Sequence, residues 1–305
     1  MRLRIEAWDP DYGSAAESEP PTAGGEVVVD IERPRADWAP IGRASGVAAE
    51  PVVLFVDGVR RTDAYGWIDD DWACAFASYA AGVVRCDATS AAVREYEIGR
   101  GVASAATSLT TVPTTCGDYR PLAVRDGTPV GLNTAIQSAM TTIEVRVSFA
   151  ARAADPDALL VVDGPLRERR HVNDVVGLVK RHYVRYLGDL DAVVGALRPG
   201  ERTPVFLLPS QWGKYSWYLR LPGPDQGPWS GVVRIEAPAE LATAAAVDLA
   251  DRTSVTLPRF ASAPHKDGRA PQNLYPIGGL ERTLRHRLGD PAFVLRSLRA
   301  AAGTG

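Results

Sequence analysis

Two apolar segments, each followed by Asp-Gly, constrain the fold of this chain more than any other feature. The first reads PVVLFV (51–56) and precedes Asp57, and the second reads ALLVV (158–162) and precedes Asp163. Short continuous apolar runs rich in β-branched side chains are typical of strands buried on both faces of a sheet. The two segments therefore predict central strands of an α/β fold, each with a carboxylate at its end.

Helices and further strands are predicted around these two segments. Apolar residues recur at 3.6-residue spacing from Leu132 to Arg152 and again from Val172 to Leu187, which predicts two amphipathic helices. Strands between residues 60 and 99 are expected to form an antiparallel meander. The other expected strands are 2–8, 26–32, 204–209, 217–221 and 231–236, and the other expected helices are 240–252 and 279–288.

Length and composition indicate one large folded unit. The chain has 305 residues, of which 46% are hydrophobic, and this is enough for a sizeable core. We expect residues 51–305 to form one α/β domain, a mixed β-sheet flanked by helices. Residues 1–50 are expected to be an N-terminal extension that contributes partner or dimer contacts.

Charge and cysteine content limit the class of protein and its compartment. Lys and Arg total 34 and Asp and Glu total 37, so a local basic groove is possible but a uniformly basic surface is not. The spacing of Cys74, Cys86 and Cys116 predicts free thiols rather than disulfides or a zinc ribbon. No apolar run approaches the roughly 18 residues of a membrane helix and no secretory signal is visible, so we expect a cytoplasmic protein without membrane contact.

The two Asp-Gly dipeptides also carry the candidate chemistry. Either one alone is most simply a turn, but α/β proteins build their sites at strand ends. Two carboxylates held close together repel unless a cation or a proton lies between them. Glu144, at the border of the apolar stripe of the 132–152 helix, is a third candidate, although by itself it reads as an ordinary boundary residue. Asp57, Glu144 and Asp163 together would suit a two-metal site with Mg²⁺ or Mn²⁺.

The order and spacing of these segments resemble the NurA family of nucleases, RNase H-like enzymes that work beside the HerA-type DNA translocase. The matching stretches are VLFVDG (53–58), the helix with Glu144, LLVVDGPL (159–166), VGLVKRHY (176–183), WYLRLPG (217–223), VVRIEAP (232–238) and RAPQNLYPIGGLERTLRHRLGD (269–290). The resemblance implies an RNase H-like fold with Asp57, Glu144 and Asp163 as metal-binding carboxylates. It also implies that Lys180 and Tyr183 lie near the scissile phosphate.

The same resemblance implies an activity and its partners. The expected reaction is metal-assisted hydrolysis of DNA by an exonuclease, with 5′–3′ polarity as the first expectation and endonuclease activity as a second option. A homodimer that docks on a hexameric HerA-type ATPase is expected, in DNA end processing, repair or anti-phage defence.

Two positions depart from the family pattern. Val59 stands where the family often has Ser or Thr after the first Asp-Gly. Family members often carry a C-terminal Ala-His pair near the site, and His286 in LERTLRH is out of register with it. His265 and Asp267, in the loop SAPHKDGRAPQN (262–273), are therefore the alternative fourth metal ligands. For His265, a solvent-exposed loop position is the simpler interpretation.

Basic residues after the second Asp-Gly are the candidate DNA contacts, namely Arg167, Arg169, Arg170, Arg181 and Arg185. On the helix predicted for 172–187, Arg181 and Arg185 would form an i, i+4 pair able to follow a phosphate backbone. Aromatic residues that follow are better explained as core than as platforms for stacked bases: Trp212, Tyr215, Trp217 and Tyr218.

Two other classes of function are considered. A catalytically inactive adaptor subunit is disfavoured because it has no need to hold three carboxylates together. An actin-like ATPase or phosphotransferase needs Gly-rich phosphate loops, and neither Asp-Gly is followed by one. The chain also lacks the G-x-x-x-x-G-K-[ST] motif, the G-x-S-x-G elbow of Ser hydrolases, and the second Asp of haloacid-dehalogenase-like phosphatases, whose place is taken by Val59.

Overall fold

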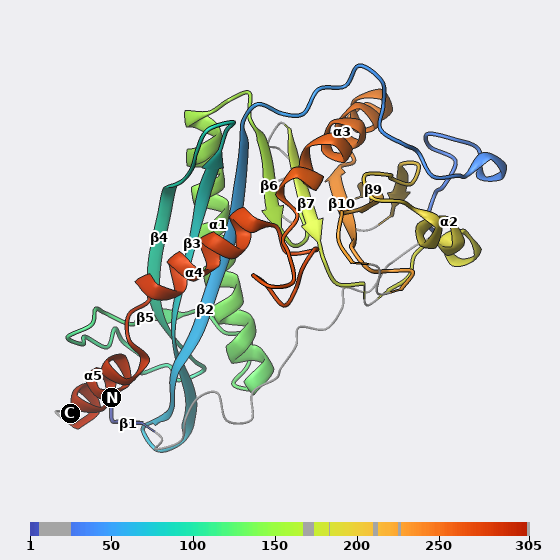
Figure 1. Cartoon of the computed structure of the whole chain (residues 1–305). Helices are drawn as coiled ribbons and strands as arrows, with labels where there is room; N and C mark the ends of the chain where they lie inside the picture. The colour runs from blue at the N-terminus through green and yellow to red at the C-terminus, as the bar shows by residue number, and fades with distance from the viewer. Residues whose placement is uncertain (6–25, 167–173, 183, 210–212, 225–226, 304–305) are drawn as a thin grey trace.

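One mixed β-sheet organises the molecule (Figure 1). The computed structural model describes residues 1–5, 26–166, 174–182, 184–209, 213–224 and 227–303. In these residues ten strands form the sheet, and β1 (Leu3–Ile5) pairs with the far end of β2. The remaining strands lie in the order β5 (Arg120–Leu122), β4 (Ala91–Ser104), β3 (Trp72–Cys86), β2 (Val53–Ile68), β6 (Leu159–Asp163), β7 (Val175–Val179), β10 (Val232–Pro238), β9 (Lys214–Arg220) and β8 (Phe206–Leu208).

Helices cover both faces of this sheet. On one face α1 (Pro129–Ala154) packs against β2, β3 and β4, and on the other face α4 (Tyr275–Arg287) crosses the same strands. The core on the α4 face also contains α3 (Thr243–Thr256). The shorter or peripheral elements are η1 (Arg35–Asp37), η3 (Gly188–Leu190), α2 (Asp191–Ala196), η4 (Leu257–Phe260) and α5 (Pro291–Gly303).

Alternation along β2 decides which face each side chain reaches. Phe55 and Val59 belong to the core cluster that contains α4, whereas Leu54 and Val56 belong to the cluster that contains α1. Successive side chains of a strand point to opposite faces. Asp57 therefore faces α4, and the position of Gly58 faces α1.

The pairing of β2 with β6 is parallel and in register. It runs from Val53 opposite Leu159 to Val56 opposite Val162. The next rung of the ladder holds Asp57 and Asp163, and β6 ends there while β2 continues. The strand register therefore makes the two carboxylates adjacent. They lie where the pairing of β2 with β6 ends, while β3 still pairs with β2 on its other side.

The predicted mixed sheet with flanking helices is confirmed, as are the antiparallel meander and the helix at 132–152. The first Asp-Gly, however, does not end its strand. β2 runs through it and has 16 residues in all, because β3 pairs with it from Val53 opposite Cys86 to Ile68 opposite Trp72. The strands predicted at 51–56 and 60–68 are one element.

The helix predicted from Val172 to Leu187 is wrong. Residues Val175–Val179 form strand β7, which lies between β6 and β10, and residues 180–182 leave it without helical structure. Apolar residues in the segment VVGLV satisfy both a helical and a buried-strand pattern, and pairing on both sides selects the strand. Consequently Lys180, Arg181 and Arg185 do not lie on a helix.

The strand predicted at 26–32 is also wrong. Only an isolated bridge joins Val28 to Leu207 there. The helices α2 and α5 and the short strand β5 were not predicted. In the part of the chain that the structure describes, no helix has the length and apolar character needed to cross a membrane. The three cysteines, all within the described residues, form no disulfide.

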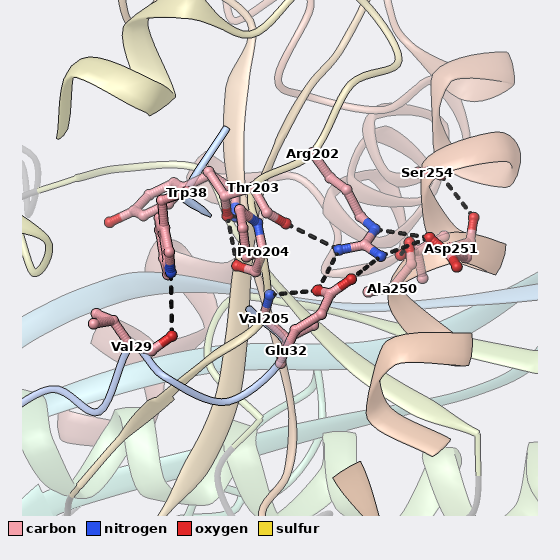
Figure 2. Close-up of polar contacts among 12 residues, drawn as sticks. Val29, Glu32, Trp38, Arg202, Thr203, Pro204, Val205, Ala250, Asp251 and Ser254 are labelled. Carbon is pink, nitrogen blue, oxygen red and sulfur yellow. Dashed lines mark hydrogen bonds and ion pairs between the residues drawn. The ribbon is translucent and has the colours of Figure 1, made fainter. Parts of the chain in front are cut away.

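Residues 26–50 contact the sheet near β8 and β9. Ile41 bridges to Arg202, and the Glu32 carboxylate accepts hydrogen bonds from both terminal nitrogens of Arg202 at 2.8 Å (Figure 2). Asp251 of α3 accepts from the same guanidinium at 2.7 and 2.9 Å. One buried arginine therefore connects the N-terminal segment with α3.

Candidate metal centre

Asp57 and Asp163 lie side by side on the sheet face that α4 covers. Both follow an apolar strand segment, and the in-register pairing of β2 with β6 brings them together. Asp57 is 6% exposed, and the side chain of Asp163 is 14% exposed. Two acidic groups therefore lie close together in a largely dry environment. Ionisation of both is unfavourable there unless a cation lies beside them.

Helix α4 brings a third carboxylate, Glu281, to the same point. Its buried stripe includes Ile277 and Leu284, and Glu281 lies on the same side of the helix, four residues after Ile277. Carboxylate oxygens of Asp57, Asp163 and Glu281 all lie within 4.8 Å of one another. Carboxylates from a long strand, a strand end and a helix thus converge.

Glu144 approaches from the opposite face of the sheet. It is buried on α1, and its carboxylate lies directly over Gly58. A Cβ atom at residue 58 would be 2.5 Å from Oε1 of Glu144, so the glycine leaves the space that this carboxylate occupies. Glu144 also helps to raise the pKa of Asp57, as the smallest of several contributions. Acidic groups from both faces therefore act at the free edge of β2.

Lys180 provides a cation at this edge. It directly follows β7, and its Nζ donates to Asp163 Oδ2 at 2.6 Å and to Asn273 Oδ1 at 2.8 Å. Asn273 in turn donates through Nδ2 to Asp267 Oδ2 at 2.6 Å. The structure thus brings Lys180 to the acidic cluster, and the loop before α4 holds it there.

Burial controls the electrostatics of the cluster. It raises the pKa of Asp57 well above the usual range, and the neighbouring Asp163 adds to this effect. Burial also raises the pKa of Asp163, although Lys180 opposes the shift. Burial likewise acts to raise the pKa of Glu281, but the hydrogen bonds and charge of Arg269, together with the charges of Lys180 and Arg285, outweigh it and the pKa is lowered. In the two aspartates, unlike Glu281, neighbouring cations and hydrogen bonds do not outweigh the cost of burying the ionised carboxylate.

The unpartnered oxygens of these aspartates indicate what the cluster can bind. Asp57 Oδ1 accepts from the Gly58 amide at 2.7 Å, but Asp57 Oδ2 and Asp163 Oδ1 are buried without any hydrogen-bond partner. Buried polar atoms are normally paired, so each exception calls for a ligand or another explanation. An all-oxygen set of carboxylates fits the hard cations Mg²⁺ and Mn²⁺.

The candidate fourth ligands from the sequence occupy different surroundings. His265 and His286 are exposed. The carboxylate of Asp267 accepts hydrogen bonds from Asn273 and from the backbone amide of Arg269. Within the described residues, the group that joins the two aspartates is Glu281. Sequence reasoning missed it, although its spacing from the apolar positions of 277–284 could have placed it on the buried face of a helix.

The predicted DNA contacts are only partly placed. Tyr183 and the arginines at 167, 169 and 170 lie outside the described residues. Arg181 and Arg185 are both exposed, and the Arg185 guanidinium lies 5.2 Å from the ring centre of Trp229.

The expected core role of the aromatic residues fits the structure. Tyr215, Trp217 and Tyr218 are buried in β9, and Trp212 lies outside the described residues. Val59 is buried in the core cluster under α4.

Comparison with known proteins finds one family model and several solved structures that are similar to this chain. A family model for the NurA domain matches residues 87–277. Among solved structures, the chain is similar to the NurA nuclease from Sulfolobus solfataricus, with a TM-score of 0.50 and 11% identity over 82% of this chain and 84% of that one. The catalytic domain of human endonuclease V matches with a TM-score of 0.37 and 17% identity over 82% and 89% of the two chains. No curated protein sequence matches the chain.

Proposed function

Because this chain belongs to the NurA family of nucleases, with more than half of its length matching the family model, we propose that it hydrolyses DNA phosphodiester bonds with divalent metal ions. The reaction would take place at the cluster of Asp57, Asp163 and Glu281. The observation that carries this proposal is that two aspartates each have a buried oxygen without a partner, and that one oxygen from each of Asp57, Asp163 and Glu281 lies within 4.8 Å of the others.

The ligands follow from the geometry of the cluster. Asp57, Asp163 and Glu281 would bind the cation directly, and Glu144 would contribute from the α1 face across Gly58. An all-oxygen donor set of this kind suits Mn²⁺ or Mg²⁺. When bound, such ions would activate water and stabilise the developing charge on the phosphoryl group and the leaving oxygen.

Lys180 would contribute by charge and position. Its Nζ is held by Asp163 and Asn273 at the rim of the cluster, with the side chain 17% exposed. A fixed ammonium group in a partly dry site stabilises a phosphate more strongly than the same group in water. Lys180 would therefore orient the substrate phosphate beside the carboxylates and lower the energy of the charged transition state.

The finer assignments rest on membership of the family. We propose that the substrate is DNA and that the protein acts as an exonuclease with 5′–3′ polarity. The partner would be a hexameric HerA-type ATPase, and the nuclease would work as a homodimer at DNA ends, in repair or in anti-phage defence.

The direct test is a degradation assay on end-labelled single- and double-stranded DNA. The purified chain is incubated with Mn²⁺, with Mg²⁺ or with EDTA, and Asp163→Asn is run in parallel. We expect metal-dependent degradation that EDTA and the variant both abolish. The label position, at the 5′ or the 3′ end, reports polarity from the order in which products appear.

A silent wild-type chain would be tested again with a HerA-type ATPase added. Activity that appears only then would support a nuclease controlled by its partner. If the complex forms and degradation is still absent, the enzymatic proposal is overturned and the chain is an inactive adaptor.

A further inference from the structure

We infer that Arg269 is a positioning residue of the metal centre, which holds the Glu281 carboxylate against the two aspartates and makes a glutamate usable as a ligand there. This inference rests on the proposed metal-dependent function. It adds a residue that does not touch the metal or the substrate but acts through Glu281.

The contact between Arg269 and Glu281 is bidentate. Arg269 Nη1 donates to Glu281 Oε1 at 2.8 Å, and Nη2 donates to Oε2. Two parallel hydrogen bonds from a planar guanidinium fix both the direction and the rotation of a carboxylate. The Glu281 side chain is only 14% exposed, so the pair lies at the entrance of the cluster rather than in free solvent.

Arg269 is itself held in place by the loop before α4. Asp267 Oδ1 accepts from the Arg269 amide at 2.8 Å and from its Nε at 3.3 Å. Asp267 Oδ2 accepts from Asn273, and Asn273 Oδ1 accepts from Lys180, which donates to Asp163. An unbroken series of polar contacts therefore joins Glu281 to Asp163.

Gly278 lets this loop lie against α4. A Cβ atom at residue 278 would be 3.1 Å from Asp267 Oδ2 and 3.2 Å from Asn273 Nδ2. Both contacts are tighter than side chains normally make, so the loop is fitted to this face of the helix. The same face carries Glu281, three residues further on, which brings the loop and the ligand together.

Charge explains why Glu281 needs such a partner. Its oxygens lie within 4.8 Å of oxygens on Asp57 and Asp163, so repulsion would turn an untethered glutamate away from them. Lys180 already pairs with Asp163. Arg269 is therefore the cation that pairs directly with the third carboxylate.

Two effects of Arg269 on metal affinity oppose each other. Its positive charge repels a cation, but the side chain is 51% exposed, and solvent screens charges at that exposure. Its hydrogen bonds orient a ligand, and removing an orienting contact around a metal typically weakens binding by about 10- to 100-fold. Orientation should therefore dominate, and loss of Arg269 should weaken metal binding rather than strengthen it.

The test measures Mn²⁺ affinity by titration calorimetry on the full chain without DNA. Arg269→Gln should bind Mn²⁺ about 10- to 100-fold more weakly than the wild type, and Arg269→Lys should recover part of the loss. In a Glu281→Gln background, adding Arg269→Gln should change affinity by less than about threefold, because the two residues act as one unit. Arg35→Gln is the matched control, since Arg35 is equally exposed (51%) and pairs with Asp189.

Each outcome separates the two proposals. If the wild type does not bind Mn²⁺, the metal-dependent function fails, whatever the variants do. If the wild type binds and Arg269→Gln binds equally well or more tightly, the positioning role is overturned while the metal centre stands. The role is also overturned if Arg35→Gln weakens binding as much, or if the loss persists undiminished in the Glu281→Gln background.

Discussion

Two buried groups of charged residues in this molecule are built on opposite principles. The guanidinium of Arg202, 1% exposed, is surrounded by Glu32, Asp251 and the carbonyl of Thr203, and all three of its nitrogens donate hydrogen bonds (Figure 2). Glu32 additionally accepts from the Val205 amide at 2.8 Å. Every nitrogen of this guanidinium therefore has a hydrogen-bond acceptor within the protein.

The acidic cluster, by contrast, contains buried oxygens without a hydrogen-bond partner. Asp57 Oδ2 and Asp163 Oδ1 are buried and have no partner, and negative charges outnumber the cations beside them. Buried charges stabilise a fold only when they are paired and hydrogen-bonded. The charges of the Arg202 group are therefore compensated within the fold, whereas the acidic cluster leaves buried carboxylate oxygens uncompensated at a cost to stability.

The largest effect should come from Asp57→Asn. We expect nuclease activity to fall about 1000-fold or more, because the variant lacks a ligand of the cation that would stabilise the charge of the transition state. The unfolding free energy of the metal-free protein should stay the same or rise, because a buried, repelled charge is removed. DNA degradation in Mn²⁺ and urea unfolding in EDTA measure the two quantities.

Asp63→Asn is the matched control on the same strand. Asp63 is 5% exposed, but it accepts from Ser78 at 2.5 Å, Tyr119 at 2.8 Å and Arg61 at 2.7 Å. This variant should lose about 1–3 kcal/mol of stability and keep its Mn²⁺ affinity. If Asp57→Asn destabilised the protein as much as Asp63→Asn, the contrast between the two kinds of carboxylate would be refuted.

Arg202→Met should give the next largest effect. It leaves Glu32 and Asp251 facing each other without the cation between them, and breaking a buried ion pair in this way costs about 3–5 kcal/mol. Urea unfolding measures the loss, and the folded fraction should bind Mn²⁺ as the wild type does. Further replacement of both acids by apolar residues should recover most of the stability. An unchanged unfolding midpoint for Arg202→Met would contradict our interpretation of this group.

Gly58→Ala should have a smaller effect that is confined to the acidic cluster. The added methyl group would lie 2.5 Å from Glu144 Oε1, so the carboxylate must move while the β2 backbone stays paired with β3. We expect about a tenfold loss of activity, corresponding to about 1.4 kcal/mol of transition-state stabilisation. Gly42→Ala is the control, because nothing lies within 4 Å of a Cβ there. Equal activity of both variants would exclude Glu144 from the working site.

The two Asp-Gly dipeptides show how far the sequence could predict this site. The apolar runs before them identified two central strands, and parallel neighbours bring their aspartates together. The dipeptides themselves are not equivalent: Gly164 follows the end of β6 with φ of 90°, whereas Gly58 continues inside β2 and makes room for Glu144. Local sequence cannot distinguish these roles, because they depend on which strand continues past its neighbour.

Other features of the fold and the site also depend on tertiary contacts and could not be predicted from local sequence. The segment VVGLV around Val176 fits a helix or a buried strand by periodicity, and only its pairing with β6 and β10 makes it a strand. In the sequence, Glu281 does not stand out from the other charged residues of ERTLRHR. Only the packing of α4 against β2 brings it to the aspartates. Arg269 gains its role from Glu281, 12 residues later, through a contact that no local pattern marks.

The smallest effect concerns pH and again separates the two groups of charges. Burial raises the pKa of Asp57 and of Asp163 above the ordinary value of 3.8. Above that value the folded, metal-free protein holds protons that the unfolded chain has released. Its unfolding free energy should therefore decrease as the pH rises from about 4 through the folded-state pKa values. The lowered pKa of Glu281 opposes this trend at the acidic end, and the pKa of His182, lowered by burial, opposes it below the ordinary histidine value of 6.5.

Urea unfolding in EDTA at several pH values between about 4 and about 8 measures this slope. Asp57→Asn should flatten it, while Arg202→Met should lower stability at every pH without removing the decrease. Saturating Mn²⁺ should reverse the sign, because metal competes with protons for the same oxygens and binds better as they are released. If Asp57→Asn left the slope of the metal-free protein unchanged, the aspartates would already be compensated in the folded state, and the cluster would then resemble the Arg202 group.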